Sequence, residues 1–343
     1  MRKHVATTQD IARHVGVSRA TVSYVLNGKS NSRISETTRE AVLSAATELK
    51  WRRNRIAEAM PIGRIYTIGV VIGDKDAIRA QYVKDLYVAI SLAAHIRNLR
   101  TTLVLGSPED GVRVNDLGDG RLDGIIAIGN FCTAEWIAAV EEIGLPCVTV
   151  GSSSGKHTIN PPDEAGAYSA VRYLHELGHR RIAHVAGSKH RAAARLRCQG
   201  FLQAVRDFGL NAEHCPVVHC ETLPEVVQGV LAVLNRPLSV RPTAVFAFTD
   251  QNALYALDAI RLAGLRVPDD ISLIGYDNEI TATVMRPQLT TIQNPINEIA
   301  EATVTQLQSL CDDNWDASES IAPLLPTRVI VRQSTAPPVT TRT

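Results

Sequence analysis

The chain has 343 residues, of which 45% are hydrophobic and 21% charged, and this length exceeds what a single hydrophobic core needs. Its six scattered cysteines exclude a small disulfide-rich domain and favour a reducing compartment, the cytoplasm. The chain has neither an apolar run long enough to cross a bilayer nor a secretory signal, so we expect neither a membrane anchor nor a secreted binding protein.

The net charge of +1 hides an uneven distribution. The segment that ends at Arg64 contains twelve Lys and Arg against five Asp and Glu, so the rest of the chain carries more acidic than basic residues. A basic segment neutralises DNA phosphates, and the counterions it releases make its affinity fall with salt. We therefore expect a nucleic-acid-binding head joined to an acidic body.

The amino-terminal residues predict two short helices joined by a tight turn. Thr7 is a good cap for a helix that starts at the next residue, and Asp10 lies in the first turn of that helix. Gly16 can take the left-handed conformation that ends it, and Ser18 can cap a second helix that runs to Asn27. The pattern is typical of a helix-turn-helix that reads the major groove, with a generic helical hairpin as the alternative.

A third predicted helix, from Ser35 to Leu49, has the apolar stripe needed to close a three-helix core. Its closure leaves polar side chains of the second helix free to reach base edges and phosphates. Arg19, Thr21, Ser23 and Tyr24 lie near the exposed start of the second helix and are expected to contact DNA, together with Thr7, Ser18 and Asn27.

After Arg64, short β-rich runs alternate with amphipathic helices, which is typical of parallel sheets with crossover helices. The predicted strands are 66–72, 101–105, 124–128, 147–150, 182–186, 244–248 and 272–276, and predicted helices include 82–98, 135–143, 165–177, 193–208 and 252–263. About 280 residues exceed one comfortable core, so we expect two lobes.

Residues 7 to 60 resemble the DNA-binding head of the LacI/GalR family of bacterial transcriptional regulators, and the body resembles the same family to about residue 332. The motifs that carry the resemblance are Thr7-x2-Asp10-Ile11-Ala12, Gly16-Val17-Ser18, Ala20-Thr21-Val22-Ser23 and Val25-Leu26-Asn27-Gly28 in the head, and Glu176-Leu177-Gly178-His179, Arg197-x2-Gly200-Phe201 and Pro287-x-Leu289-Thr290-Thr291-Ile292 in the body.

The resemblance implies an α/β two-lobed, periplasmic-binding-protein-like body of doubly wound parallel sheets, preceded by an all-α helix-turn-helix head. The expected domains are the head at 1–53, a hinge helix and linker at 54–64, the effector-binding and dimerisation body at 65–332, and a Pro/Thr-rich disordered tail at 333–343.

In this family the hinge helix orders on operator DNA and inserts an apolar side chain into the minor groove. The resemblance places Met60 at the wedge position, and it makes Asn54, Arg55 and Ala57 expected DNA contacts. It also implies that Ala20 of the head enters the major groove. Arg53 stands where the family usually has proline, which would leave the hinge less preorganised. An ordinary basic linker is the alternative, because so short a segment does not hold a helix without a partner.

The resemblance also implies an effector between the lobes. Arg197 is a candidate ligand because a guanidinium fork can hold paired hydroxyls or a carboxylate. Asp277, Thr249 and Asp250 follow predicted strands, where open α/β sheets place ligands, and a surface or capping role is the alternative for each. The segment 73–79 departs from the family pattern, so no contact is carried over from the first lobe. We expect replacement of Arg197 by alanine to abolish the effector response and to leave operator affinity near normal.

The combined expectation is a cytoplasmic homodimeric transcriptional regulator, a repressor, controlled by a sugar or related metabolite. Its paired heads would read a palindromic operator, with helix 82–98 or 135–143 at the body interface. The alternative within this class is a corepressor-dependent regulator that responds to a purine, a nucleoside or a partner protein.

A different class is a serine hydrolase that uses Ser153 within Gly151-Ser152-Ser153-Ser154-Gly155. This hypothesis is disfavoured because the residues that follow read as extended, whereas a nucleophile elbow leads into a helix. The His214-Cys215 and His219-Cys220 pairs lack the spacing of a metal site and favour a partly buried strand. We therefore expect no enzyme activity, cofactor, metal or membrane contact.

Overall fold

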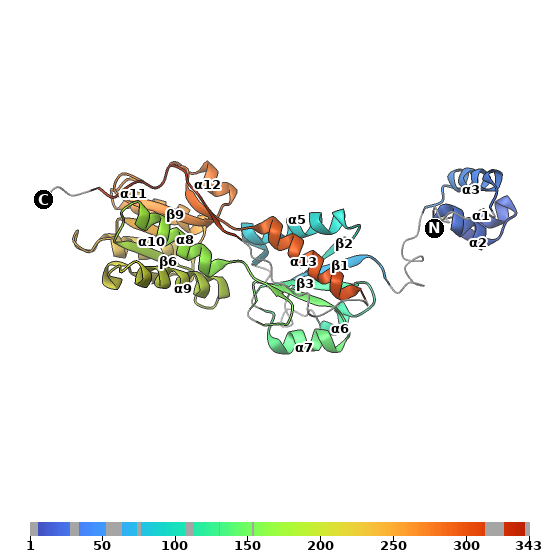
Figure 1. Ribbon diagram of the computed structural model, residues 1–343, viewed down its shortest axis with the longest axis horizontal. Helices are drawn as coiled ribbons and strands as arrows, with labels where there is room; N and C mark the ends of the chain where they lie inside the picture. The colour runs from blue at the N-terminus through green and yellow to red at the C-terminus, as the bar shows by residue number, and fades with distance from the viewer. Residues whose placement is uncertain are drawn as a thin grey trace. The chain divides into compact units, whose positions relative to one another are not determined.

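The computed structural model describes residues 6–27, 34–52, 64–73, 77–106, 113–129, 131–152, 154–312 and 326–339. The chain divides into two compact units, Met1–Ile65 and Tyr66–Thr343. Each unit has its own hydrophobic core, so we call the first the head and the second the body (Figure 1). No helix among the described residues is long and apolar enough to span a membrane.

The head contains the three helices expected from the sequence: α1 (Thr8–Val15), α2 (Arg19–Leu26) and α3 (Glu36–Glu48). Thr7 caps α1 in a capping box with Asp10, and Gly16 ends it at a φ of 77°. The side chain of Ser18 accepts from the N–H of Thr21 and so caps α2. The three helices enclose a core of Ile11, Ala12, Val22, Val25, Val42, Ala45 and Ala46.

The body consists of two lobes, each with a central sheet. Lobe 1 has five parallel strands in the order β2-β1-β3-β4-β5, namely β1 (Thr67–Ile72), β2 (Arg100–Leu105), β3 (Gly124–Ile128), β4 (Cys147–Val150) and β5 (Thr158–Ile159). A short 3-10 helix, Ala77–Arg79, precedes α5 (Gln81–Ile96), and α6 (Val114–Leu117), α7 (Ala134–Glu142) and α13 (Ile296–Cys311) complete the lobe.

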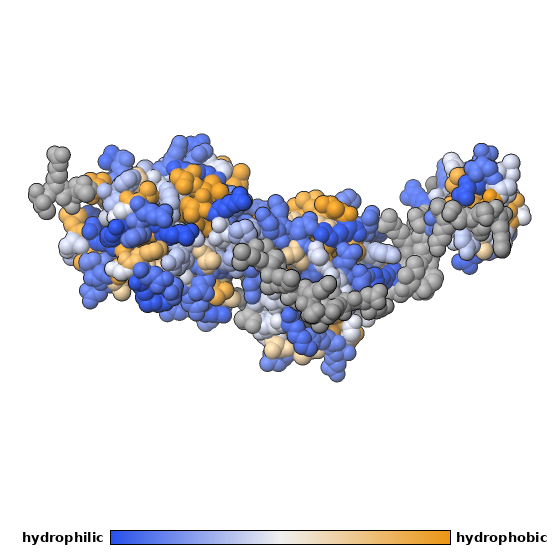
Figure 2. Space-filling model, in the orientation of Figure 1, coloured by the Kyte–Doolittle hydropathy of each residue, from blue (hydrophilic) through white to orange (hydrophobic). Residues whose placement is uncertain are grey.

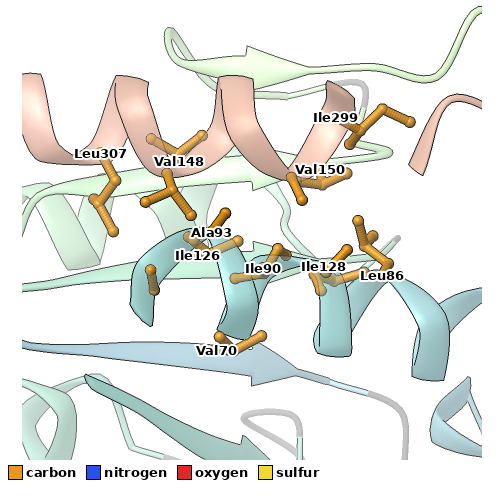
Figure 3. Packing of buried hydrophobic residues seen from close by; sticks show 14 of the residues in the cluster. Val70, Leu86, Ile90, Ala93, Ile126, Ile128, Val148, Val150, Ile299 and Leu307 are labelled. Atoms are coloured by element: carbon orange, nitrogen blue, oxygen red, sulfur yellow. The ribbon is translucent and has the colours of Figure 1, made fainter. Parts of the chain in front are cut away.

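Helices cover both faces of the lobe 1 sheet because successive strand residues point to opposite sides. Val70 and Ile126 pack with α5 and α13 (Figure 3), whereas Val71 and Ile125 pack with α6 and α7 on the other face. Buried, β-branched strands with helices on both sides are the doubly wound arrangement that the sequence predicts.

Within the described residues, lobe 2 has six strands in the order β11-β10-β9-β8-β6-β7, of which only β11 is antiparallel. They are β6 (Ile182–Ala186), β7 (Val217–His219), β8 (Ala244–Ala247), β9 (Ser272–Asp277), β10 (Thr290–Gln293) and β11 (Arg328–Ile330). The helices are α8 (Asp163–Glu176), α9 (Ala192–Asp207), α10 (Leu223–Leu234), α11 (Asp250–Leu262) and α12 (Ile280–Val284), with a 3-10 turn at Ala212–His214. The predicted fold class, a two-lobed α/β body behind a helical head, is confirmed.

The prediction of a disordered tail is wrong for residues 333–339. The Ser334 hydroxyl donates to the Leu273 carbonyl oxygen at 2.6 Å and accepts from the Thr290 N–H at 2.8 Å. The Ala336 carbonyl oxygen lies 3.0 Å from Nε2 of the buried His179. These bonds to strands β9 and β10 hold a segment whose Pro/Thr-rich composition suggests disorder, while residues 340–343 lie outside the described residues.

Candidate DNA-binding surface and effector cavity

The exposed face of α2 carries the residues that the sequence predicts to contact DNA. Val22 and Val25 turn into the core of the head, which leaves Arg19, Ser23 and Tyr24 exposed. Ser18 and Ala20 are also exposed at the start of the helix, and Thr21 is half-buried beside them. A helix that presents its amino-terminal residues in this way fits the reading position of a helix-turn-helix.

Several of these residues also have local structural roles. The hydroxyls of Thr7 and Ser18 accept the cap hydrogen bonds of α1 and α2, and the Asn27 amide donates to the Ser23 hydroxyl at 3.2 Å. The predicted hinge contacts Asn54, Arg55, Ala57 and Met60 lie outside the described residues.

A cavity of about 650 Å³ lies between the two lobes of the body. Its lining combines apolar and aromatic side chains with polar and charged groups from both lobes, as in sites for small polar ligands. Lobe 1 contributes Gln81, Tyr82, Val83, Ile128, Val150, Ser152 and Asn160, among others, and lobe 2 contributes Asp163, Ser188, Arg191, Arg197, Gln199, Phe248, Thr249, Asn252, Asp277 and Glu279, among others.

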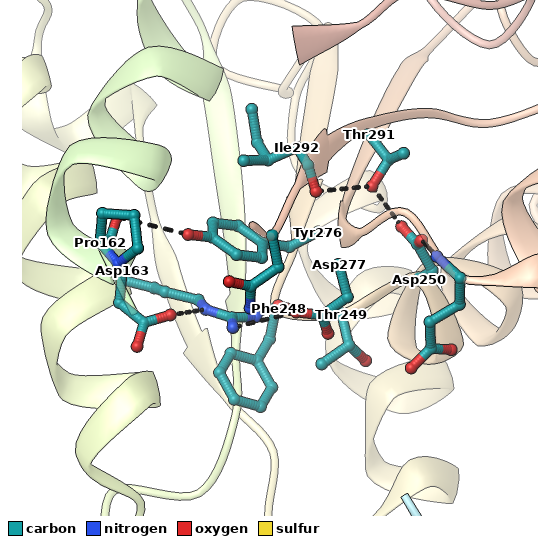
Figure 4. A network of polar contacts seen from close by, with 12 residues as sticks. Pro162, Asp163, Phe248, Thr249, Asp250, Tyr276, Asp277, Thr291 and Ile292 are labelled. Atoms are coloured by element: carbon teal, nitrogen blue, oxygen red, sulfur yellow. Dashed lines mark hydrogen bonds and ion pairs between the residues drawn. The ribbon is translucent and has the colours of Figure 1, made fainter. Parts of the chain in front are cut away.

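Arg197, on α9, holds two carboxylates at the floor of this cavity. Its Nε donates to Oδ1 of Asp163 at 2.7 Å, and its Nη2 donates to Oδ1 of Asp277 at 3.1 Å (Figure 4). Its Nη1 also donates to the Phe248 carbonyl oxygen. The exposed fractions are 4% for Arg197, 3% for Asp163 and 5% for Asp277, so this is a buried charge cluster. The sequence predicts that the Arg197 guanidinium binds the effector. In the structure it also binds two carboxylates of the protein itself.

Two aromatic rings, those of Tyr276 and Phe248, also contact the Arg197 guanidinium. The Arg197 Cζ lies 3.5 Å from the centroid of the Tyr276 ring and 4.8 Å from that of Phe248, both within cation–π distance. Burial raises the pKa of Asp163 despite the opposing effect of Arg197. The two carboxylates keep the pKa of Arg197 above its ordinary value, although burial opposes them, so the cation is retained.

Close helix packing places this cluster. A Cβ at Gly200 of α9 would lie 2.1 Å from the carbonyl oxygen of Glu164 in α8, and one at Gly166 would lie 2.2 Å from the Tyr276 hydroxyl. Only glycine allows α8 and α9 to approach this closely. Asp163 begins α8 and Arg197 lies three residues before Gly200, so the approach brings their side chains together.

Asp277 ends β9 in a left-handed conformation with a φ of 103°, and Asn278 follows at 59°. Such a conformation in a residue other than glycine costs about 1–3 kcal/mol, and it persists only where the surroundings hold it. Here Arg197 and the side-chain amide of Asn294, 3.3 Å from Oδ1 of Asp277, supply those contacts. With these contacts Asp277 forms part of the cavity lining.

The adjacent predictions Thr249 and Asp250 have different outcomes. Thr249 lines the cavity and also caps α11, because its hydroxyl accepts from the Asn252 N–H at 3.1 Å. Asp250 is fully buried and lies outside the lining. Its Oδ1 accepts from the Thr291 hydroxyl at 2.6 Å and its Oδ2 from the Glu279 N–H at 2.7 Å. The expectation that Asp250 contacts the effector is not supported, because both oxygens serve the fold.

Sequence reasoning missed most of the cavity lining, including Asp163, Tyr82 and Glu279. Asp163 follows Pro161 and Pro162, and none of the three is among the effector contacts that the sequence predicts. A carboxylate in the first turn of a predicted helix, next to a predicted cleft, was the available signal. Tyr82 and Glu279 reach the cavity from α5 and from the loop before α12, and nothing local in the sequence marks either.

Comparisons with known proteins agree with this architecture. Residues 7–54 match the model of bacterial regulatory proteins of the lacI family, and residues 171–335 match that of a periplasmic binding protein-like domain. The HTH-type transcriptional repressor PurR of Erwinia tasmaniensis is 32% identical over 346 residues, which cover 97% of each chain. Catabolite control protein A of Priestia megaterium is 29% identical and covers 96% of this chain and 99% of its own.

Two solved structures extend the similarity. The Lac repressor dimer bound to operator and the anti-inducer ONPF superposes with a TM-score of 0.81 at 26% identity, covering 97% of this chain and all of that one. A complex of the transcriptional regulator CelR with cellobiose gives 0.66 at 26% identity, covering 96% of this chain and 99% of that one.

A helix-turn-helix head and a two-lobed ligand-binding body define a transcriptional regulator controlled by a small molecule. The chain belongs to the LacI family of bacterial regulatory proteins. Its relatives are transcriptional repressors and not enzymes, which disfavours the hydrolase hypothesis for Ser153, a residue outside those described. After that position the structure has the short strand β5, whereas a nucleophile elbow requires a helix there.

Proposed function

We propose that the protein is a homodimeric cytoplasmic repressor that binds operator DNA through its head and is controlled by a small polyhydroxyl effector in the cavity between the lobes. The observation that carries the proposal is the buried Asp163–Arg197–Asp277 cluster at the floor of that cavity. The proposed effector ligands are Arg197, Asp277 and Thr249, together with Asp163. Similarity to named repressors supports the regulatory role.

The proposed DNA contacts are the residues on the exposed side of α2 and the hinge residues expected from the sequence. They are Thr7, Ser18, Arg19, Ala20, Thr21, Ser23, Tyr24, Asn27, Asn54, Arg55, Ala57 and Met60. Arg19 can reach phosphates or a guanine edge, and Tyr24 offers a hydroxyl and a ring to the same groove.

The chemistry of the cavity favours a neutral, hydroxyl-rich effector such as a sugar. Carboxylate oxygens of Asp163 and Asp277 accept hydrogen bonds from hydroxyls, and the Phe248 ring offers an apolar surface to the carbon skeleton. Solved relatives contain cellobiose and ribose, which supports this class. The alternative, a corepressor such as a purine or nucleoside that promotes DNA binding, differs in the sign of the response.

Purified full-length protein is expected to enrich a palindromic duplex from a random pool, and a member of a sugar and nucleoside panel is expected to change its affinity for that duplex. Thermal shift finds the ligand, and fluorescence anisotropy on the selected duplex measures the response. Release by a sugar supports the proposal, and tightening by a nucleoside supports the alternative. Failure to enrich any sequence over random competitor would overturn both.

The dimer is proposed to form through an apolar face that spans both lobes. Val88, Leu92 and Ile96 of α5 lie four residues apart, on one side of the helix, with exposed fractions of 53%, 59% and 73%. In lobe 2, Leu262, Ile280 and Val284 on α11 and α12 are also exposed. Figure 2 shows hydrophobic surface over α5 and over the α11–α12 region on one side of the body. Exposed apolar patches of this kind mark interaction sites.

Replacing Leu92 with arginine is expected to raise the dimer dissociation constant by about two orders of magnitude, the effect of losing a hot-spot side chain. Sedimentation velocity over a dilution series measures the change. The matched control is Leu238→Arg, because Leu238 is an exposed leucine between α10 and β8. Wild-type sedimentation of the Leu92 variant at every dilution would count against this interface.

A further inference from the structure

The turn at the end of β9 forms part of the wall of the effector cavity. It consists of Asp277, Asn278 and Glu279. The first and the last of these residues line the cavity, whereas Asn278 is not among the described residues of the lining. Asp277 and Asn278 have left-handed backbones, with φ of 103° and 59°. Asn and Asp tolerate this conformation better than most residues, but only glycine adopts it freely, so the turn depends on the contacts that hold it.

Separate contacts hold the two ends of this turn. At its start, Oδ1 of Asp277 accepts from Nη2 of Arg197 at 3.1 Å and from the side-chain amide of Asn294 at 3.3 Å. At its end, the Glu279 N–H donates to Oδ2 of the buried Asp250 at 2.7 Å. These bonds fix the residues that line the cavity, and the middle residue of the turn is held by a different part of the chain.

Arg332, which follows β11, holds this middle residue. Its Nη2 donates to Oδ1 of Asn278 at 2.7 Å, and its Nη1 donates to the Leu289 carbonyl oxygen at 2.8 Å. Its backbone N–H donates to Oγ1 of Thr290 at 2.9 Å, so Arg332 is fixed where β10 begins. A planar guanidinium makes both side-chain bonds at once, and a hydrogen bond from a charged donor is stronger than one between neutral groups. The Arg332 side chain therefore joins the turn to the start of β10.

We propose that Arg332 is a positioning residue for the effector site, because it holds Asn278 in the left-handed conformation and thereby keeps Asp277 and Glu279 in the cavity wall. This inference rests on the proposed function, in which Asp277 is an effector ligand. Arg332 is not among the described residues that line the cavity, so it acts on the effector through the turn and not by contact. A residue that lies 54 positions after the turn in sequence thus shapes the site.

Hydrogen–deuterium exchange of the full-length protein without effector tests this at the Glu279 N–H. Arg332→Ala should accelerate exchange of the peptide that contains this N–H about tenfold, the effect of losing one hydrogen bond from a charged group. Peptides from β6, which is separated from β9 by β8 in the same sheet, should keep their wild-type rates because the effect is local. The matched control is Arg328→Ala, since Arg328 is an exposed arginine on β11, and it should leave both peptides unchanged.

Two substitutions of Asn278 distinguish this role from a general loss of stability. Asn278→Ala removes the acceptor and places alanine in a left-handed conformation, so the Glu279 peptide should again exchange about tenfold faster than wild type. Asn278→Gly removes the same acceptor but adopts a φ of 59° without strain, so its exchange should stay within about threefold of wild type. In the Asn278→Gly background, Arg332→Ala should add less than about twofold, because the partner of Arg332 is already absent.

The same variants are titrated with the sugar that thermal shift selects from the panel. Arg332→Ala should weaken its binding about tenfold, and Arg328→Ala should not. Wild-type exchange in Arg332→Ala, equal exchange in the two Asn278 variants, or faster exchange with unaltered sugar affinity would overturn the inference. Should Arg332→Ala fail to fold, the two Asn278 variants decide the question. Exchange is measured without effector or DNA, so a panel or operator selection that yields nothing would reject the proposed function and leave the exchange result standing.

Discussion

Replacing Arg197 with alanine is expected to lower the free energy of unfolding of the body by about 3–5 kcal/mol, the cost of removing one partner from a buried ion pair. Asp163 and Asp277 would then face each other without a cation, both almost fully buried. Chemical denaturation followed by circular dichroism measures the change. The sequence predicts that this variant loses its effector response and keeps normal operator affinity. That prediction must be tested at a temperature and denaturant concentration at which the variant is still folded.

Arg195→Ala is the matched control for this prediction. Arg195 lies two residues away on α9, is exposed, and its side chain donates to the backbone carbonyl oxygens of Lys189 and His190. Its removal should change the free energy of unfolding by less than about 0.5 kcal/mol, as for ordinary surface substitutions. Equal destabilisation of the two variants would contradict the assignment of Arg197 to a buried cluster.

The defect of Arg197→Ala should also depend on pH. Burial already raises the pKa of Asp163, and Arg197 opposes that shift, so its removal raises the pKa further. A carboxyl whose folded pKa exceeds its unfolded pKa destabilises the fold progressively as the pH rises between the two values. The variant should therefore recover part of its stability on going from neutral to mildly acidic pH, and a defect independent of pH would contradict this.

Raising the salt from about 50 to about 200 mM is expected to weaken operator binding by about a thousandfold or more, because each dimer brings two basic heads to the phosphates. Each head carries twelve Lys and Arg against five Asp and Glu through Arg64. Fluorescence anisotropy on the selected duplex over a salt series gives the slope of log affinity against log salt. A slope near zero would contradict the prediction that the basic heads bind DNA through its phosphates.

Two substitutions on α2 distinguish a side chain that binds phosphate from an uncharged side chain, through their effect on the salt dependence of DNA binding. Arg19→Ala should reduce the salt slope by about one for each phosphate that the Arg19 side chain neutralises in the wild-type complex. Ser23→Ala removes an exposed uncharged side chain from the same helix and should leave the slope unchanged. Equal slopes for the two variants would mean that Arg19 binds no phosphate.

Local signals in the sequence predict the head and most strands of the body correctly. The caps at Thr7 and Ser18 act within three residues, and short β-branched runs such as 124–128 are buried on both faces as expected. Arg197 is correctly placed at the cavity because the resemblance carries its position. Its partners could not be predicted, since Asp163 and Asp277 are 34 and 80 residues away in sequence.

The wrong predictions, for Asp250 and for residues 333–339, also arise from contacts between residues that are far apart in the sequence. Asp250 looks like a strand-end ligand, but Gly275 has no side chain to keep it away, and Thr291 and Glu279 occupy its two oxygens. Residues 333–339 have the composition of a disordered segment, but Leu273 and Thr290, at the start of β9 and β10, offer hydrogen-bond partners that no local pattern reveals. Composition indicates how a segment behaves in isolation. Contacts with distant residues determine the order of residues 333–339 and the role of Asp250.

Lobe 1 is discontinuous, because α13 comes from near the end of the chain and contributes Ile299, Val304 and Leu307 to the core around β1 and α5. A growing polypeptide therefore cannot complete this lobe until almost all of it has been synthesised. The head, whose three helices end by Glu48, needs no residue beyond Trp51 for its own core. During synthesis, the DNA-binding head can therefore fold before the body that binds the effector. A chain truncated before α13 is expected to keep a folded head and to lack a complete lobe 1.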